Sequence, residues 1–124
     1  TQVVSPTLGH TVHNRLTHSL KVGQIARRIA ESLLVKYPEA STDENPINPD
    51  VAEAAGLAHD LGHPPFGHSA EDELNTLVRA EGLADGFEGN AQSFRIVARL
   101  ASSDATTIDG EPVDGLNLSR ATLN

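Results

Sequence analysis

Residues that can do chemistry are concentrated in one ten-residue stretch, HDLGHPPFGH at positions 59–68. It holds three of the six histidines in this 124-residue chain, together with an aspartate, two glycines and two prolines. A cation resting between His59 and Asp60 could bind an imidazole nitrogen and a carboxylate oxygen together. An isolated His-Asp pair is a weak signal, because a histidine at the end of a helix also interacts favourably with the helix dipole.

A further histidine, His18, lies in an apolar stripe near the start of the chain. The stripe repeats at spacings of three and four residues, the period of a helix face, and consists of His18, Val22, Ile25, Ile29 and Leu33. Taken alone, His18 is better explained as a buried structural histidine. Combined with His59 and Asp60, it completes a set of two nitrogen donors and one oxygen donor. Such a set suits Mg, Mn, Fe, Ni or Zn, so we expect a divalent metal ion between two helices.

His68 and Glu71 form a second candidate pair. Their spacing of three residues places both side chains on one side of a helical first turn. A carboxylate in this position can hold an imidazole in one tautomer and raise its basicity. The alternative is a coincidental surface pair.

The elements that must carry the metal ligands are two helices. A helical pattern begins near Asn14 and ends before Pro38, and the polar residues 38–48 are expected to form a loop. The run Asn48-Pro49-Asp50 combines an N-cap, a first-turn proline and a first-turn acid, which is typical of a helix start. Because Pro64 disfavours helical backbone at the residue before it, this second helix should end by about Gly62.

Two further helices are expected downstream. Ser69, followed by Asp72, is a weak capping signal for a third helix, whose apolar side holds Leu74, Leu77 and Val78. After a break at 82–86, a fourth helix should span about 90–101. Its inward-facing side chains are expected to be Ala91, Phe94, Val97 or Ala98, and Ala101. A turn-rich loop at 102–115 precedes the opening of another helix, and no segment alternates as a strand would, so the sequence predicts an all-α fold.

Composition narrows the function. The formal net charge is −8, which argues against broad binding to nucleic acid or to an anionic membrane surface. The chain has no cysteine, which excludes disulfides and thiolate zinc sites and favours the cytoplasm. No apolar run approaches the roughly 18 residues of a membrane span, and no signal peptide is visible. The length suits one domain.

Four blocks of the sequence resemble the ordered signature motifs of one enzyme family. They are RLTHS (15–19), HDLGHPPFGH (59–68), GFEGNAQS (86–93) and GLNLSRATL (115–123). Their order is similar to that in bacterial deoxynucleotide triphosphohydrolases, the dGTPase-like branch of the HD-domain hydrolases. The resemblance implies an all-α HD-domain helical bundle, of which residues 1–124 are the N-terminal part of a single domain. The family's fourth metal ligand is an aspartate beyond the final block, so the bundle is expected to be incomplete at its C-terminal end.

The resemblance also implies roles for individual residues. The metal ligands would be His18, His59 and Asp60. His68 would act on the α-phosphate, with Glu71 supporting it. Three residues would contact the substrate: Arg15 and His63 at the phosphates, and Gln2 at the sugar 3′-hydroxyl. In some relatives a histidine stands at the position of Gly89.

The implied reaction converts a deoxynucleoside triphosphate and water into a deoxynucleoside and inorganic triphosphate. It would need a divalent metal ion, and the enzyme would be a cytoplasmic homo-oligomer. Two alternatives stay open. One is another HD-type nucleotide phosphodiesterase or phosphatase, and the other is a non-catalytic nucleotide-binding regulator on the same scaffold.

Overall fold

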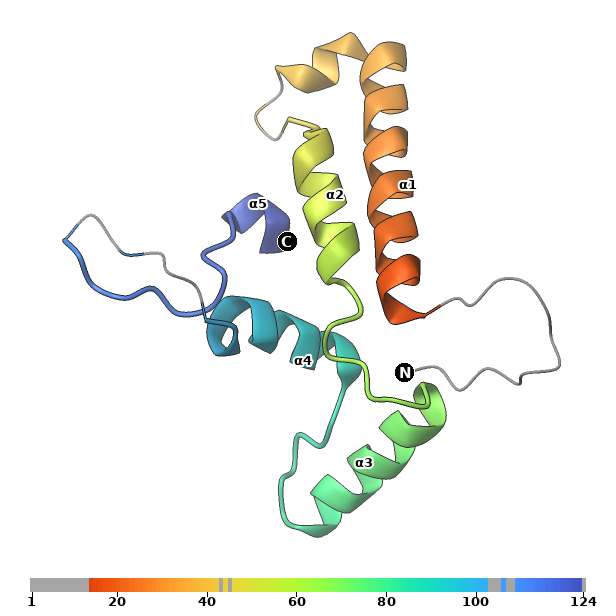
Figure 1. The fold of residues 1–124 in the computed structure, drawn as a ribbon, viewed down its shortest axis with the longest axis vertical. Helices are drawn as coiled ribbons and strands as arrows, with labels where there is room; N and C mark the ends of the chain where they lie inside the picture. The colour runs from red at the N-terminus through yellow and green to blue at the C-terminus, as the bar shows by residue number, and fades with distance from the viewer. Residues whose placement is uncertain (1–13, 43, 45, 103–105, 107–108, 124) are drawn as a thin grey trace, which may run out of the picture.

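The computed structural model describes residues 14–42, 44, 46–102, 106 and 109–123, and this part of the chain is helical (Figure 1). No strand occurs within it; an isolated bridge joins Thr106 to Pro112. The all-α prediction is therefore confirmed. The elements in chain order are α1 (Arg15–Lys36), the 3-10 turn η1 (Pro38–Ser41), α2 (Pro49–Ala58), α3 (His68–Ala80), α4 (Gly89–Arg95), the π-helix η2 (Ile96–Leu100) and α5 (Arg120–Leu123).

The helix α1 begins where the sequence predicts. Asn14 and Thr17 form a capping box: the Asn14 side chain accepts a 2.8 Å hydrogen bond from the backbone N–H of Thr17. In return, the Thr17 hydroxyl accepts a 3.1 Å bond from the N–H of Asn14. These bonds satisfy donors that a helix start leaves without partners.

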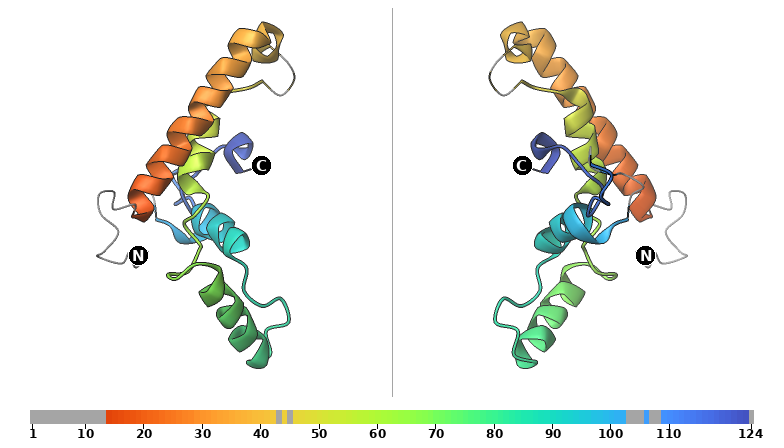
Figure 2. Two further views of the ribbon diagram at one scale, coloured as in Figure 1. Left: turned by 90° about the vertical axis from the view of Figure 1, so that its right-hand side faces the viewer. Right: turned by 90° about the vertical axis from the view of Figure 1, so that its left-hand side faces the viewer.

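The helix α2 runs antiparallel beside α1 (Figure 1, Figure 2). Small residues line the contact between them. Gly23 of α1 and Gly56 of α2 are both buried. A β-carbon built on Gly56 would lie 2.9 Å from Cα of Gly23, so the two backbones touch. Arg27 then bridges the helices by ion pairs to Asp50 (2.5 Å) and Glu53 (2.8 Å). These carboxylates raise the pKa of the Arg27 guanidinium above its ordinary value, Asp50 contributing most.

The apolar stripe of α1 is largely exposed in the described part of the chain. Ile25 and Ile29 are 59% and 56% exposed, whereas the buried residues of α1 are Gly23 and Ala30. Packing on glycine and alanine brings the helix axes closer than packing on isoleucine would. His18 is exposed with the stripe, so it is not a buried structural histidine.

The second helix ends before the stretch 59–68. Its last residue is Ala58, which agrees with the expectation that it ends by about Gly62. Beyond it the chain tightens into turns, in which Leu61 N–H bonds to the carbonyl of Ala58 and His63 N–H to that of Asp60, both at 3.3 Å.

The helix α3 begins at His68, with Gly67 and not Ser69 at its N-cap. Gly67 has φ 66°, a conformation that glycine adopts without strain. Its carbonyl accepts hydrogen bonds from the N–H groups of Ala70 (3.1 Å) and Glu71 (3.2 Å). No side-chain capping bond forms at this helix start.

The fourth helical segment lies close to its expected position. Glu88 caps α4 by accepting hydrogen bonds from the N–H groups of Asn90 and Ala91, and η2 continues the helix to Leu100. The expected inward face is partly wrong. Val97 is buried as expected, but Ala91 and Phe94 are exposed, and Ser93 is buried instead. Ser93 faces inward because its hydroxyl bonds to the turn after α2.

The described residues form an open arrangement rather than a closed bundle (Figure 2). α3 extends away from the α1–α2 pair, and the connection at 81–88 returns to α4 beside the turn after α2 (Figure 1). Among the described hydrophobic residues, the buried ones are Ala30 and Val97. In this part of the chain, every helix is too short or too polar to cross a lipid bilayer.

Candidate functional site

The three predicted metal ligands lie together at one end of the α1–α2 pair. The ligand-type atoms of His18, His59 and Asp60 are all within 4.8 Å of one another. The two imidazole rings are 5.4 Å apart, centroid to centroid, and tilted by 57°. The glycine contact sets this approach, since His18 precedes Gly23 by five residues and His59 follows Gly56 by three.

A backbone hydrogen bond orients the ring of His59. Its Nδ1 lies 2.7 Å from the carbonyl oxygen of Gly56, one turn earlier. A carbonyl can only accept, so Nδ1 carries the proton and Nε2 of the neutral ring keeps its lone pair. This arrangement is typical of metal-binding histidines, whose other nitrogen donates to a fixed oxygen.

A cavity of about 370 Å³ opens in front of these ligands. It is lined by Arg15, His18, His59, Asp60, His63, Phe66, Gly67 and His68, and so gathers six of the eight predicted site residues. Glu71 does not line the cavity but contacts Nδ1 of His68. Gln2 is outside the described residues. The volume falls within the range of small-molecule sites.

His63 lines this cavity, and its ring lies beside Asp60. Its Nδ1 is buried and lies 3.3 Å from a carboxylate oxygen of Asp60. The two groups are not aligned for a hydrogen bond, and Nδ1 has no hydrogen-bond partner among the described residues.

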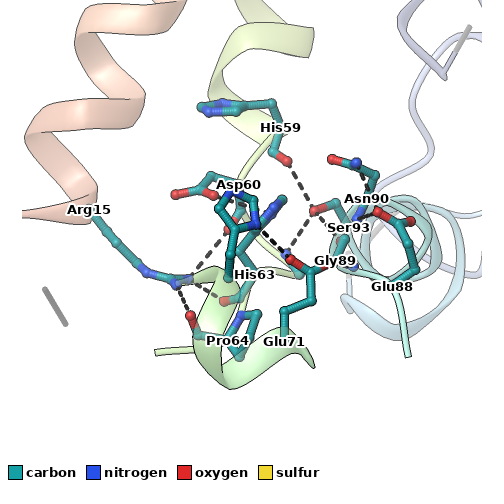
Figure 3. A network of polar contacts seen from close by, with 12 residues as sticks. Arg15, His59, Asp60, His63, Pro64, Glu71, Glu88, Gly89, Asn90 and Ser93 are labelled. Atoms are coloured by element: carbon teal, nitrogen blue, oxygen red, sulfur yellow. Dashed lines mark hydrogen bonds and ion pairs between the residues drawn. The ribbon is translucent and has the colours of Figure 1, made fainter. Parts of the chain in front are cut away.

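His68 and Glu71 pair as their spacing predicts. Nδ1 of His68 lies 3.1 Å from Oε2 of Glu71, and the His68 ring is otherwise exposed. The second oxygen of Glu71 accepts a 2.6 Å hydrogen bond from the backbone N–H of Gly89 (Figure 3). The Gly89 N–H, followed by His68, lowers the pKa of the Glu71 carboxyl below its ordinary value. Glu71 is therefore ionised at neutral pH and can hold a protonated His68.

Arg15 reaches from the first turn of α1 to the turn after α2. Its guanidinium donates to the backbone carbonyls of His63 (2.5 Å) and Pro64 (2.6 Å). A longer bond of 3.4 Å reaches the backbone carbonyl of Asp60 (Figure 3). These bonds hold the double-proline turn against α1. They direct part of the guanidinium at the backbone, while Arg15 also lines the cavity.

Sequence reasoning missed the contribution of α4. The hydroxyl of Ser93 bonds to the turn that carries the metal ligands, and Gly89 supports Glu71. A β-carbon at Gly62 would lie 2.1 Å from the backbone nitrogen of Ser93, so this turn also needs a glycine. The block at 86–93 marked the region, but no periodicity or spacing assigned a partner to Ser93.

A side chain at position 89 has little room here. A β-carbon on Gly89 would lie 3.0 Å from Oε1 of Glu71 and 3.1 Å from the ring of His63. Both neighbours belong to the site, so a side chain at this position would displace one of them.

A family model described as "HD domain" matches residues 15–120. The chain belongs to the HD domain family. The matched span includes the described candidate residues from Arg15 to Glu71, and also Ser93.

This HD domain is similar to several bacterial proteins named deoxyguanosinetriphosphate triphosphohydrolase-like protein. The relative from Corynebacterium glutamicum is 48% identical over 124 residues, which are all of this chain and 25% of that protein. The Streptomyces coelicolor relative is 45% identical, covering all of this chain and 26% of that protein. The Wolinella succinogenes relative is 42% identical, covering 99% of this chain and 29% of that protein. The chain therefore spans about a quarter of the length of the curated relatives it matches.

Proposed function

We propose that the whole protein hydrolyses a deoxynucleoside triphosphate to a deoxynucleoside and inorganic triphosphate, using a divalent metal ion. One observation carries this proposal: the metal-type donors and His68, which Glu71 holds, line the same cavity. The names of the relatives and the four motif blocks support the choice of substrate. On this proposal, residues 1–124 are the N-terminal part of a single domain.

The donors present fit a divalent ion. His18, His59 and Asp60 offer two imidazole nitrogens and a carboxylate oxygen within 4.8 Å of one another, and the Gly56 carbonyl leaves Nε2 of His59 able to bind. Mg, Mn, Fe, Ni and Zn all accept such a set. When bound, the ion would supply Lewis acidity toward the α-phosphate and a more acidic water.

His68 would supply the proton for the leaving group. Water oxygen forms a bond to the α-phosphorus, the bond from phosphorus to O5′ breaks, and O5′ takes a proton from Nε2 of imidazolium His68. The proton lost by the water passes to solvent. Glu71 accepts from the Nδ1 proton of His68 and stays ionised because Gly89 N–H also binds it. This is general acid catalysis with a held imidazole.

Arg15, His63 and Gln2 would bind the substrate. His63 and Arg15 both line the cavity where phosphates would sit. Gln2 would contact the sugar 3′-hydroxyl. The net charge of −8 disfavours a highly charged anion, so metal and basic groups must offset that repulsion. We further propose a cytoplasmic homo-oligomer that does not bind nucleic acid through this segment.

Product analysis with the whole protein tests the proposal. Each deoxynucleoside triphosphate is incubated with Mg²⁺ or Mn²⁺, and phosphorus NMR identifies the released phosphate. Intact triphosphate with free deoxynucleoside is expected, and none should form with EDTA or in His59→Ala. A nucleoside monophosphate or orthophosphate would instead identify an HD-type phosphodiesterase or phosphatase. Tight nucleotide binding without turnover would identify a regulator.

A further inference from the structure

Ser93 is buried between the two halves of the candidate site, with 7% of its surface exposed. It lies on α4 and its hydroxyl contacts the turn that follows α2 (Figure 3). We infer that Ser93 is a positioning residue, which holds the metal-ligating turn and the support for Glu71 in one fixed arrangement. This inference deepens the proposed function and rests on it.

The hydroxyl satisfies backbone groups on both sides of Asp60. It accepts a 2.8 Å hydrogen bond from the N–H of Gly62 and lies 3.0 Å from the carbonyl oxygen of His59. The His59 carbonyl follows the last residue of α2, where helix carbonyls lack partners within the helix. Ser93 therefore fixes the backbone at residues 59 and 62, and so the placement of the His59 and Asp60 side chains between α1 and α4.

The hydroxyl has a single proton to share between two carbonyls. Besides the carbonyl of His59, that of Gly89 lies 3.0 Å away. Gly89 is four residues earlier on the same helix, so a bond to it only returns the hydroxyl to its own backbone. The acceptor bond from Gly62 N–H uses a lone pair and coexists with either donation. The contact between α4 and the turn therefore persists whichever carbonyl receives the proton.

The same turn of α4 also supports the proton donor. Gly89 N–H binds Glu71, which binds His68. The backbone of α4 lies so close to Gly62 that a β-carbon there would be 2.1 Å from Ser93 N. Because this approach leaves no space, a shift of the Ser93 contact would move both the metal donors and the partner of Glu71.

Three substitutions in the whole protein separate hydrogen bonding from packing. Ser93→Ala removes the hydroxyl, Ser93→Cys keeps the volume with a weak donor and acceptor, and Ser93→Thr keeps the hydroxyl. Ser32→Ala, at an exposed position of α1, is the matched control. Mn²⁺ affinity is measured without nucleotide, and amide hydrogen exchange is followed at residues 59–63.

We expect Ser93→Ala and Ser93→Cys to bind Mn²⁺ about 10- to 100-fold more weakly, the usual effect of losing a group that orients a metal ligand. The Gly62 amide should exchange faster in both. In Mn²⁺ affinity and in Gly62 exchange, Ser93→Thr should stay closer to the parent than Ser93→Cys does. Ser32→Ala should match the parent in both. If Ser93→Ala does not fold, the comparison of Ser93→Cys with Ser93→Thr tests whether the hydroxyl is needed.

Two results would overturn the inference. One is a Ser93→Cys protein with parental Mn²⁺ affinity and Gly62 exchange, which would make Ser93 a space-filling residue. The other is unchanged exchange in a folded Ser93→Ala protein. A parent that binds no Mn²⁺ would refute the proposed function instead, while faster Gly62 exchange in the Ala and Cys variants would still support the positioning role.

Discussion

The backbones of Gly23 and Gly56 are in direct contact where α1 and α2 pack together. A β-carbon on Gly56 would lie 2.9 Å from Cα and 3.1 Å from N of Gly23, and both are main-chain atoms that cannot rotate away. His18 and His59 lie close to this contact along their helices. The two imidazoles therefore project from helices that a backbone contact holds close together.

The Gly56→Ala substitution should destabilise the protein by about 1–3 kcal/mol, the range for overpacking a close contact. It should also weaken metal binding, because the helices must separate. Helix propensity alone predicts the opposite sign, a gain of about 1 kcal/mol. Urea unfolding and Mn²⁺ titration of the whole protein measure both effects. A more stable Gly56→Ala protein would show that the helices pack with more space than the structure gives them.

The His59→Ala substitution should abolish metal-dependent activity and leave helix content nearly unchanged. The side chain is exposed and follows the last residue of α2, so little packing is lost. Circular dichroism combined with metal analysis of the purified protein measures the two effects. A variant that unfolds, yet keeps its activity per folded molecule, would make His59 a structural residue.

The His68→Ala substitution should keep metal and nucleotide binding but reduce kcat by about 10²- to 10⁴-fold, the usual contribution of a general acid. Glu71→Gln should reduce kcat less, because Glu71 only holds the imidazole of His68. The double variant should lose little more than His68→Ala, since both residues act through one proton. Triphosphate release at saturating nucleotide gives kcat, and binding is followed separately. Turnover within twofold of the parent would remove His68 from the mechanism.

The pKa of Glu71 should stay below its ordinary value of 4.5 in His68→Ala, because the Gly89 N–H is the larger cause of the shift. A carboxyl whose pKa is lowered on folding stabilises the protein above its unfolded pKa, and this stability is lost as pH falls through the folded pKa. The destabilisation by Glu71→Gln should therefore be present above pH 4.5 and shrink below it. NMR titration of the carboxyl group and unfolding at several pH values provide the two measurements. A return of the Glu71 pKa to 4.5 in His68→Ala would make His68, and not Gly89, the main cause of the lowered pKa.

Features that depend on neighbours along the chain were predictable. The starts of α1 and α2 follow from Asn14 and from Asn48-Pro49, because each N-cap side chain bonds to a backbone N–H two or three residues later. The His68–Glu71 pair follows in the same way from the geometry of one helical turn. The grouping of His18 with His59 and Asp60 came from residue chemistry, and the structure brings these side chains together.

Features that depend on packing between helices were not predictable from these patterns. The periodicity of α1 correctly indicated a helix, but the buried residues of this helix are Gly23 and Ala30, which lie outside the apolar stripe and allow a closer approach than the isoleucines. Ser93 bonds to residues 31 and 34 positions earlier in the chain, and Gly89 bonds to one 18 positions earlier. Hydrogen bonds of this kind exist only after α4 has folded back beside the turn that follows α2. A pattern over three or four residues records local backbone geometry, whereas the support of this site depends on contacts between distant segments.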